Sequence, residues 1–376
     1  MKTLIALHNK LTRRLLHYSL ASMLTLLACS LSGCNGLGTY DDLEECPRGV
    51  IMRFVFDYNL EYANSFPHHV DCLSVYLFNE AGELQEKRIE TTEVLADEDW
   101  RMTFDLPAGN YQVVAYGGLE CDMASFAHTK AAEDIKRIED LEVLMNPEHV
   151  GDEDARPYEK LHDLFHGIHT FTVNEGTEYD KTTVHMIRDT NNIRIVLQHL
   201  DNTPVDDKDF RFEIVDDNIW FNYNNDVLPH HTVTYTPWIT GTASAGLNGI
   251  PSMSDAPSRA GAVEAHEVQV AYADLSVSRL MHQSDFTWTN ENGLSQQGPR
   301  LRIISKENGR IVVDLPLNNY LLLLKGEHLA SMPAQEFLDR ANNYSLVFFL
   351  DRDNAWVRMN IVVNNWTVRV NNISEF

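Results

Sequence analysis

The stretch Val50-Ile51-Met52-Arg53-Phe54-Val55-Phe56-Asp57-Tyr58 alternates between two kinds of side chain. Its apolar residues at positions 50, 52, 54, 56 and 58 fall on one face of an extended chain, and the polar Arg53 and Asp57 fall on the other. A period of two is the pattern of a β-strand that covers a core with one face. We therefore predict a strand here and a body built from similar strands.

More strands are expected on both sides of this stretch. Leu73–Phe78 predicts a second strand, which Asn79-Glu80-Ala81-Gly82 closes with a turn. Near the end of the chain, residues 344–350, 356–363 and 366–370 predict consecutive strands, the first two joined by a hairpin turn at Asp351-Arg352-Asp353-Asn354. Short helices are few, and one is expected to start at Ser331-Met332-Pro333. The fold class is therefore all-β.

One turn sequence occurs twice. Asp105-Leu106-Pro107-Ala108-Gly109-Asn110-Tyr111 lies between two strand patterns and predicts a hairpin. Asp314-Leu315-Pro316-Leu317-Asn318-Asn319-Tyr320 repeats it, with predicted strands at Ile311–Val313 and Leu321–Leu324. Matching flanks indicate two related domains, whose boundary we place at 188/189, giving domains 47–188 and 189–376.

Length and charge limit the class of protein. A chain of 376 residues suits two ordinary domains, and 44% hydrophobic with 10% aromatic residues is globular. The formal net charge is −25. Such a chain repels other polyanions, which argues against nucleic acid and anionic lipid as partners.

The N-terminus predicts a secretion signal. Basic residues precede an apolar run, Tyr18–Leu31, of about 14 residues, which is the length of a signal-peptide core. An uncleaved membrane anchor is the alternative, but spanning needs roughly 20 apolar residues. The run ends in Leu31-Ser32-Gly33-Cys34, which looks like the lipobox of bacterial lipoproteins, and Cys29 has a poorer one. We expect residues 1–33 to be removed and Cys34 to be acylated.

A short leash, residues 34–46, follows the acylated cysteine. Its acidic stretch Asp41–Glu45 resembles a signal for export to the outer face of some Gram-negative cells, and reads equally well as a solvated linker.

Three cysteines remain after the signal and the acylation site. Cys72 lies in an apolar strand pattern and is predicted to be a buried thiol. Cys46 and Cys121 lie at loop-like positions in an oxidising compartment, so we predict that these two are bonded.

No pattern indicates catalysis. The sequence has no G-x-S-x-G, Walker or H-E-x-x-H motif, so we expect no enzyme activity and no cofactor. His162, His166 and His169 would share one side of a helix and are the best metal candidate. Gly167 and the strand pattern after His169 remove that helical face, so no metal is predicted. Residues 351–354 faintly resemble a calcium loop but lack its glycine and distal glutamate.

Trp220, Trp238 and Trp288 sit among polar neighbours and could stack on sugars. Partly buried strand tryptophans are the favoured interpretation. A surface glycan-binding lipoprotein is therefore the alternative function.

Several ordered motifs together resemble one family, the FimB-type fimbrial anchor or accessory lipoproteins of type V pili in Gram-negative anaerobes. They begin with the Cys34 lipobox, Cys46-Pro47 and Phe54–Asn59, and continue through the mature chain. The other motifs are Asp105–Tyr111, Tyr116-Gly117-Gly118-Leu119, Leu161–Gly167, Val277-Ser278-Arg279-Leu280, Tyr344–Leu350 and Asn365-Trp366-Thr367-Val368. Cys72 is not part of the family pattern.

The resemblance implies two tandem transthyretin-like β-sandwich domains and a place in a pilus built by strand exchange. Pilin subunits of the same fimbrium would be the partners, and the N-terminal lipid would bind the outer membrane. The expected strand-exchange segment is Trp366–Phe376, in which Trp366, Val368 and Val370 alternate toward one face.

A role at the base of the filament follows from the tether. Stalk subunits of such pili lose an N-terminal segment to open a groove, whereas a subunit anchored by its N-terminus must keep it. The expected function is therefore a surface-exposed, lipid-tethered subunit that holds the pilus at the outer membrane, limits its length and supports adhesion.

Overall fold

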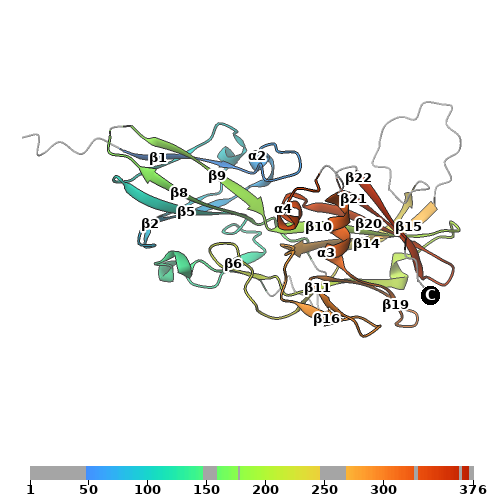
Figure 1. The fold of residues 1–376 in the computed structure, drawn as a ribbon. Helices are drawn as coiled ribbons and strands as arrows, with labels where there is room; N and C mark the ends of the chain where they lie inside the picture. The colour runs from blue at the N-terminus through green and yellow to red at the C-terminus, as the bar shows by residue number, and fades with distance from the viewer. Residues whose placement is uncertain are drawn as a thin grey trace, which may run out of the picture. The chain divides into compact units, whose positions relative to one another are not determined.

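The computed structural model describes residues 48–146, 159–176, 178–245, 268–325, 329–363 and 366–371. Contacts divide the chain into Met1–Pro47 and Arg48–Phe376, and every structural statement below concerns the second unit (Figure 1). Cys34, Cys46, the predicted signal peptide and the leash lie outside the described residues.

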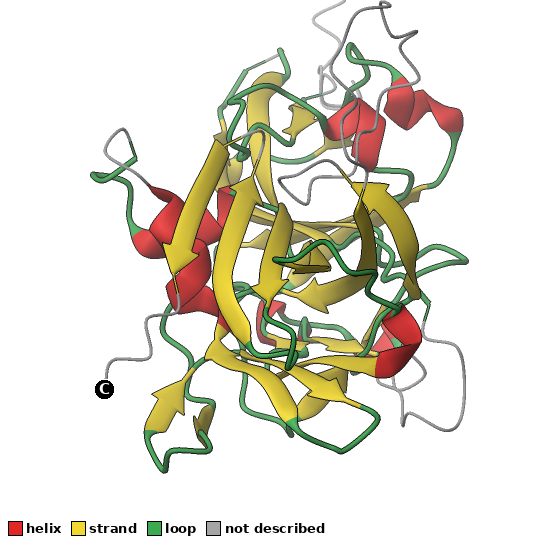
Figure 2. Cartoon of the chain, turned by 90° about the vertical axis from the view of Figure 1, so that its right-hand side faces the viewer, coloured by secondary structure: helices red, strands yellow, loops and turns green. Residues whose placement is uncertain are grey.

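The protein is mostly β, which confirms the predicted fold class at this level (Figure 2). Its strands are β1 (Gly49–Val55), β2 (Leu73–Asn79), β3 (Leu84–Glu90), β4 (Met102–Asp105), β5 (Gly109–Gly117), β6 (Phe126–His128), β7 (Val143–Met145), β8 (Phe165–Val173), β9 (Asp180–Arg188), β10 (Thr190–His199), β11 (Phe210–Asp216), β12 (Trp220–Phe221), β13 (Val233–Tyr235), β14 (Ile239–Ala245), β15 (Val268–Ser278), β16 (Thr287–Thr289), β17 (Ser295–Gln297), β18 (Arg300–Ser305), β19 (Ile311–Pro316), β20 (Asn343–Leu350), β21 (Trp356–Val363) and β22 (Trp366–Asn371). The helices are short: α2 (Phe66–His69), η3 (Glu93–Ala96), η4 (Ala132–Asp134), η5 (Ile138–Asp140), η7 (Asp207–Asp209), α3 (Leu317–Leu321), η8 (Leu322–Lys325) and α4 (Ala334–Arg340).

The strands before Thr190 build a seven-stranded sheet in the order β3-β2-β5-β8-β9-β1-β4. β1 runs parallel to β9, and the other neighbours are antiparallel. The sheet folds over so that β1, β4 and β9 share one core with β2, β5 and β8. Val50, Met52 and Phe54 of β1 face this core, as the alternation predicts.

β2 is buried on both faces, which explains its unbroken apolar run. Leu73, Val75 and Leu77 face the core shared with β1. Tyr76 and Phe78 face the opposite way, into a larger cluster that continues into the second half of the chain. The small sheet β12-β7-β6 contributes to that larger cluster, and in it β12 from the second half pairs with β7 from the first.

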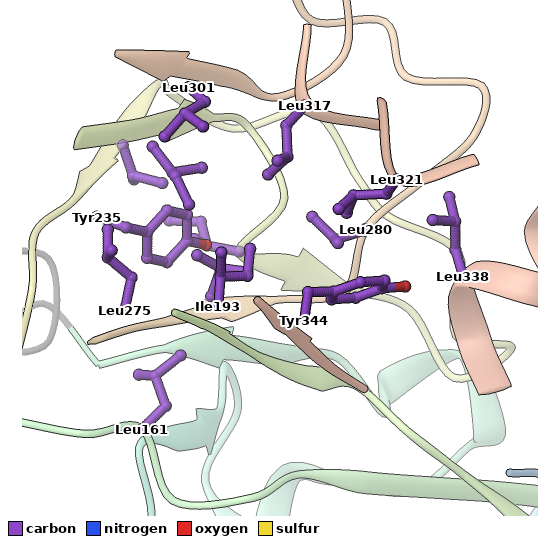
Figure 3. Packing of buried hydrophobic residues seen from close by; sticks show 14 of the residues in the cluster. Leu161, Ile193, Tyr235, Leu275, Leu280, Leu301, Leu317, Leu321, Leu338 and Tyr344 are labelled. Carbon is purple, nitrogen blue, oxygen red and sulfur yellow. The ribbon is translucent and has the colours of Figure 1, made fainter. Parts of the chain in front are cut away.

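The strands after Arg188 build a six-stranded sheet, β14-β15-β10-β20-β21-β22, and a four-stranded sheet, β13-β11-β18-β19. Alternate residues of both sheets fill the larger core, among them Ile193, Leu275 and Leu301 (Figure 3). Figure 3 also shows Leu317 and Leu321 of α3 beside Leu280.

The hairpin predicted at Asp105–Tyr111 is wrong. β4 pairs with β1, whereas β5 pairs with β2 and β8, so the turn carries the chain from one layer to the other. The strands that pair with β4 and β5 are far away in sequence, so a local turn pattern does not predict which strands pair.

The strand predicted at Leu321–Leu324 is wrong as well, because α3 and η8 cover these residues. Leu317, Leu321 and Leu324 are buried. Their spacing of four and three residues is that of one helix face. Leucine favours helices over strands when packing permits, so the second copy of the turn sequence leads into a helix rather than a strand.

Two local predictions are confirmed. β20 and β21 form a hairpin through Asp351–Asn354, where Asn354 has φ 57° and the Asp351 carboxylate accepts from the amides of Asp353 and Ala355. α4 begins directly after Pro333, close to the predicted helix start.

Candidate functional site

The strand expected to take part in strand exchange lies at an edge. β22 (Trp366–Asn371) is the last strand of the six-stranded sheet and pairs with β21 on one side, while no other described strand pairs with its second side. An edge strand presents unpaired amides and carbonyls to a further strand. β22 is therefore a site where another chain could extend the sheet.

The register supports the predicted alternation. Val368 pairs with Ile361 and Val370 pairs with Met359, and both partners belong to the core. Directly opposed residues of an antiparallel pair lie on the same face of a sheet. Positions 366, 368 and 370 thus alternate along β22 on one side of the strand.

The first strand has the opposite character. β1 lies inside the seven-stranded sheet, paired with β9 on one side and β4 on the other. Val50 and Met52 are fully buried. Only residues 35–48 separate β1 from Cys34. A strand in this position fills its sheet, so no gap is left there for a strand from another subunit.

Several of the motifs that resemble the family lie where residues before 189 contact residues after 188, here called the two halves of the chain. His166 of β8 is buried, and its Nε2 lies 2.9 Å from the carbonyl oxygen of Tyr223. A carbonyl only accepts, so Nε2 carries the proton. Burial lowers the pKa of His166 to about 4, because the charged imidazolium would lose its hydration. His166 is therefore a neutral hydrogen-bond donor between the halves, and not a free metal ligand.

A second link surrounds Asp163. Its carboxylate accepts from the buried Arg188 guanidinium at 2.5 Å and from the Thr190 hydroxyl at 3.2 Å. Gly118 (φ +77°) packs so closely that an added Cβ would stand 1.9 Å from the Asp163 carbonyl oxygen. The close contact between the Gly118 and Asp163 backbones therefore explains why the Tyr116–Leu119 motif has a glycine at this position, beside the Leu161–Gly167 motif.

Beside the junction, the second half contains a buried ionic cluster of Asp189, Asn225, Arg279 and Asp339. Arg279 donates to both carboxylate oxygens of Asp339 at 2.8 Å and to the Asn225 carbonyl at 2.6 Å. Asp189 accepts from the Asn225 side chain at 2.8 Å, and its second oxygen has no partner among the described residues. Desolvation raises the pKa of Asp189 to about 7.

A third link between the halves joins α4 to the end of the Phe54–Asn59 motif. The Arg340 guanidinium lies 3.8 Å from the Tyr58 ring centroid and 4.6 Å from that of Tyr62, and donates to the Asn59 carbonyl at 3.3 Å. Stacking on two rings fixes this loop against the second half of the chain.

The predicted disulfide between Cys46 and Cys121 is wrong. Cys121 is bonded to Cys72, with 6.0 Å between their Cα atoms. The β2–β5 register opposes Leu73 and Gly117, and the Gly118 amide donates to the Cys72 carbonyl. Pairing of β2 with β5 therefore holds Cys72 beside the turn that carries Cys121. Cys72 is buried as expected, but as half of a disulfide and not as a thiol.

The three histidines do not converge. β8 carries His166 and His169, which alternate to opposite faces of a strand, and His162 precedes β8 and contacts Asp71 at 2.9 Å. The strand after Gly167 thus removes the helical face, as the sequence predicts.

The tryptophans are also separate. Trp288 is buried in β16, Trp220 is half-buried beside His230, and Trp238 is 36% exposed. Among the described residues no ring contact joins the three. Trp288 does line a pocket of about 500 Å³ with Tyr320 and polar groups.

Sequence reasoning missed the junction itself. Arg188-Asp189-Thr190-Asn191 marks a predicted boundary, yet all four residues are buried. The available signal was a charged, polar run placed directly between two apolar strand patterns, together with Arg279 and Asp339 inside apolar segments. No helix among the described residues is both long and apolar enough to cross a membrane.

Solved structures share this fold. A candidate adhesin of Bacteroides thetaiotaomicron is 42% identical, with a TM-score of 0.74 over 88% of this chain and 100% of that one. A candidate polysaccharide-binding protein of the same species is 25% identical, with a TM-score of 0.66 over 87% of this chain and 99% of that one. The fimbrial anchor protein Mfa2 of Porphyromonas gingivalis, at 14% identity, has the same fold, with a TM-score of 0.57 over 86% and 99% of the two chains.

Sequence comparison points the same way. The minor fimbrium anchoring subunit Mfa2 of P. gingivalis is 29% identical over 108 residues, which are 28% of this chain and 32% of that protein. The aligned stretch therefore spans about a third of that relative's length. Residues 43–372 match the profile of the fimbrillin-A associated anchor proteins Mfa1 and Mfa2, and the chain belongs to this family.

Proposed function

We propose that this chain is a lipid-tethered anchor or accessory subunit that holds a strand-exchanged pilus at the outer membrane, limits its length and supports adhesion. Membership of the fimbrial anchor family gives the class of function, which is structural and adhesive. The observation that carries the rest is a contrast between two strands. β1 is paired with strands on both sides, whereas β22 is paired with a strand on only one side among the described residues.

Strand exchange needs a donor strand and an open groove. β22 supplies unpaired main-chain groups and an alternating sequence, and main-chain hydrogen bonds with alternate side chains are what β-augmentation uses. We assign Trp366, Val368 and Val370 to this contact, with pilin subunits of the same fimbrium as partners.

The retained β1 accounts for termination. A stalk subunit that loses its first strand can accept a donor, but a subunit that keeps β1 cannot do so at that position. Acylation of Cys34, at the end of a leash formed by residues 34–46, would keep this strand in place and attach it to the membrane. Chain addition would then stop at the base.

The proposal includes two tandem transthyretin-like sandwiches, 47–188 and 189–376. Its support is that the large sheets divide at the β9–β10 junction: β9 ends at Arg188 and β10 begins at Thr190. The small sheet β12-β7-β6 and the hydrogen bond between His166 and the Tyr223 carbonyl would then hold the two domains together.

Negative-stain imaging of cells and spent medium, with and without this gene, tests the anchor role. We expect the deletion strain to lose cell-bound filaments or to shed long ones. Equal numbers of equally long, cell-bound filaments in both strains would contradict the role.

A truncation tests the docking segment separately. We expect a chain lacking residues 366–376 to remain acylated and membrane-bound but to retain no pilin after detergent extraction and pull-down. Truncation at β22 leaves β21 as the new edge, so near-ultraviolet circular dichroism should show a folded protein. Unchanged pilin recovery would exclude β22 as the contact.

A second candidate function is glycan capture, because one pocket has the right chemistry. Trp288, Tyr320, Asn290, Gln296 and Asn319 contribute to the lining of the pocket of about 500 Å³. Aromatic rings with amides suit sugar rings and hydroxyls. Arg300 lies 4.3 Å from the Trp288 ring centroid, which covers part of that ring and argues for a weak site.

Glycan arrays with Tyr320→Ala and Gln296→Ala variants test this second function. Specific binding that both variants abolish, with normal filaments in the deletion strain, would favour glycan capture over anchoring.

A further inference from the structure

A cationic pocket lies beside β1 and β9, on an otherwise acidic protein. It has a volume of about 720 Å³ and is lined by Ile51, Arg53, Arg101, His169, Lys181, Thr182 and Thr183. Three of these side chains are cations and none is a carboxylate, although the chain has 55 Asp and Glu against 30 Lys and Arg. The charge of the pocket is therefore positive, whereas the net charge of the protein is negative.

Strand register explains how the cations come together. Met52 and Phe54 face the core, so Ile51 and Arg53 lie on the outer face of β1. The parallel register places Ile51 beside Lys181 and Arg53 beside Thr183. Arg101 directly precedes β4, whose Met102 pairs with Met52 of β1.

Protein groups leave these cations largely unsatisfied. Arg53 is half-buried, and its Nε is buried with no hydrogen-bond partner. Arg101 donates only to the carbonyls of Glu98 and Trp100, and no carboxylate among the described residues forms an ion pair with Arg53, Arg101 or Lys181. The carboxylate of Asp180, beside Lys181 in sequence, is occupied by the amide and side chain of Asn174.

Arg53 and Arg101 are half-buried cations without an ion-pair partner among the described residues, and such groups favour an anion over water. Guanidinium groups match the oxygens of a phosphate with two parallel hydrogen bonds, and a lysine adds a compact charge. The hydroxyl of Thr183, which lies beside Arg53 on the same outer face, can donate as well. Burial lowers the pKa of His169, so its ring adds a hydrogen-bonding nitrogen and no charge at neutral pH.

We propose that the pocket formed by Arg53, Arg101, Lys181 and Thr183 binds a phosphate group. Such a group can come from a phosphorylated lipid headgroup or from a soluble phosphate. The lipid source rests on the proposed tether at Cys34, because the short segment 35–48 would keep β1 close to the membrane. The pocket itself does not depend on that tether. It would be a local exception to the repulsion of anionic lipid that the net charge predicts.

The test uses the chain with Cys34→Ala, so that no acyl chain contributes to binding. Titration calorimetry with inorganic phosphate, against chloride at equal ionic strength, measures the soluble source. Co-sedimentation with phosphatidylcholine vesicles that contain phosphatidic acid, against phosphatidylcholine alone, measures the lipid source. Arg53→Gln and Lys181→Gln together should weaken binding about fivefold for each cation removed.

A control variant removes two cations elsewhere. Lys136→Gln with Lys306→Gln lowers the net charge equally, and both lysines are exposed and outside the pocket. We expect this variant to bind like the parent. Lys181→Gln alone, at an exposed position, serves if the Arg53 change prevents folding.

Binding to vesicles alone would assign the lipid source, and binding to inorganic phosphate alone the soluble one. No binding of either probe, or an equal loss in the control variant, would overturn the proposal. Such a failure leaves the anchor role untouched, because that role is measured by filament retention on cells.

Discussion

Arg279, which directly follows β15, and Asp339 of α4 form a two-point ion pair, with Nε–Oδ1 and Nη2–Oδ2 both at 2.8 Å. The pair is almost fully buried, with 11% and 6% of the two side chains exposed. Arg279→Met should lower the free energy of unfolding by about 3–5 kcal/mol, because it leaves the buried carboxylates of Asp339 and Asp189 without their cationic partner. Urea denaturation measures this loss.

The surface ion pair of Arg352 with Asp201 provides the control. Its N–O distance is similar, 2.9 Å, but 85% of the Arg352 side chain is exposed. Arg352→Met should cost about 1 kcal/mol or less. Equal losses in the two variants would show that burial adds nothing to the contribution of the Arg279–Asp339 pair.

Gly118 should tolerate no side chain. Gly118→Ala would put a Cβ 1.9 Å from the Asp163 carbonyl oxygen, at φ +77°. Gly293 has a nearly identical φ of +76° and no atom within 4 Å of the same Cβ position. Gly293→Ala should therefore cost only the backbone strain of about 1–2 kcal/mol, and Gly118→Ala clearly more. Thermal melts of both variants that moved by the same amount would contradict the close packing at Asp163.

The disulfide predicts a specific thiol count. Cys72 and Cys121 should be protected, and Cys46 should be the thiol that reacts with maleimide in the unreduced, Cys34-acylated chain. Cys72→Ala with Cys121→Ala should cost about 4 kcal/mol, the chain-entropy value for the loop between them. Peptide mapping that recovered a Cys46–Cys121 bridge would overturn this pairing.

Stability should depend on the protonation of two buried carboxyls. Burial raises the pKa of Asp189 and that of Asp216 to about 7 each, well above their unfolded values near 4. The folded state then binds more protons than the unfolded state between about pH 4 and pH 7, so stability falls as pH rises through this window. Each group contributes at most about 1.4 kcal/mol per pH unit.

Asp189→Asn should remove the contribution of Asp189 to the pH dependence of the free energy of unfolding. The lowered pKa of His166 acts in the opposite direction, since its stability contribution is lost as pH falls below about 6.5, but it is common to both proteins and cancels in the difference. Urea denaturation at pH 5 to 8 should show a shallower decline for Asp189→Asn than for the parent protein. Parallel profiles would show that Asp189 is ionised throughout.

Local patterns were enough to predict the strands but not their partners. The alternation at 50–58 places Val50, Met52 and Phe54 in the core, because a period of two survives in any sheet. The turn at Asp105 gives no sign that β4 and β5 belong to different layers, since their partners lie far along the chain. The same limit applies to Cys72, whose partner is set by the β2–β5 register.

The helical structure at Leu321–Leu324 has a signal in the sequence. Leu317, Leu321 and Leu324 show a helical spacing in the sequence, whereas the repeated turn sequence predicts a strand at the same place. The junction is a harder case, because it depends on which polar residues end up buried together. Arg188, Asp189 and Arg279 look like surface charges in the sequence, although the fold buries Arg188 and Asp189 and leaves only 11% of the Arg279 side chain exposed.

Cys34→Ala tests the central proposal, a lipid-tethered base for the pilus, most directly. Cells carrying the variant would be sheared gently, and the filaments in the medium and on the cells would be counted by negative stain. The anchor role predicts that filaments move to the medium and that this subunit leaves the membrane fraction. Filaments that stay as firmly bound to cells as in the parent strain would contradict it.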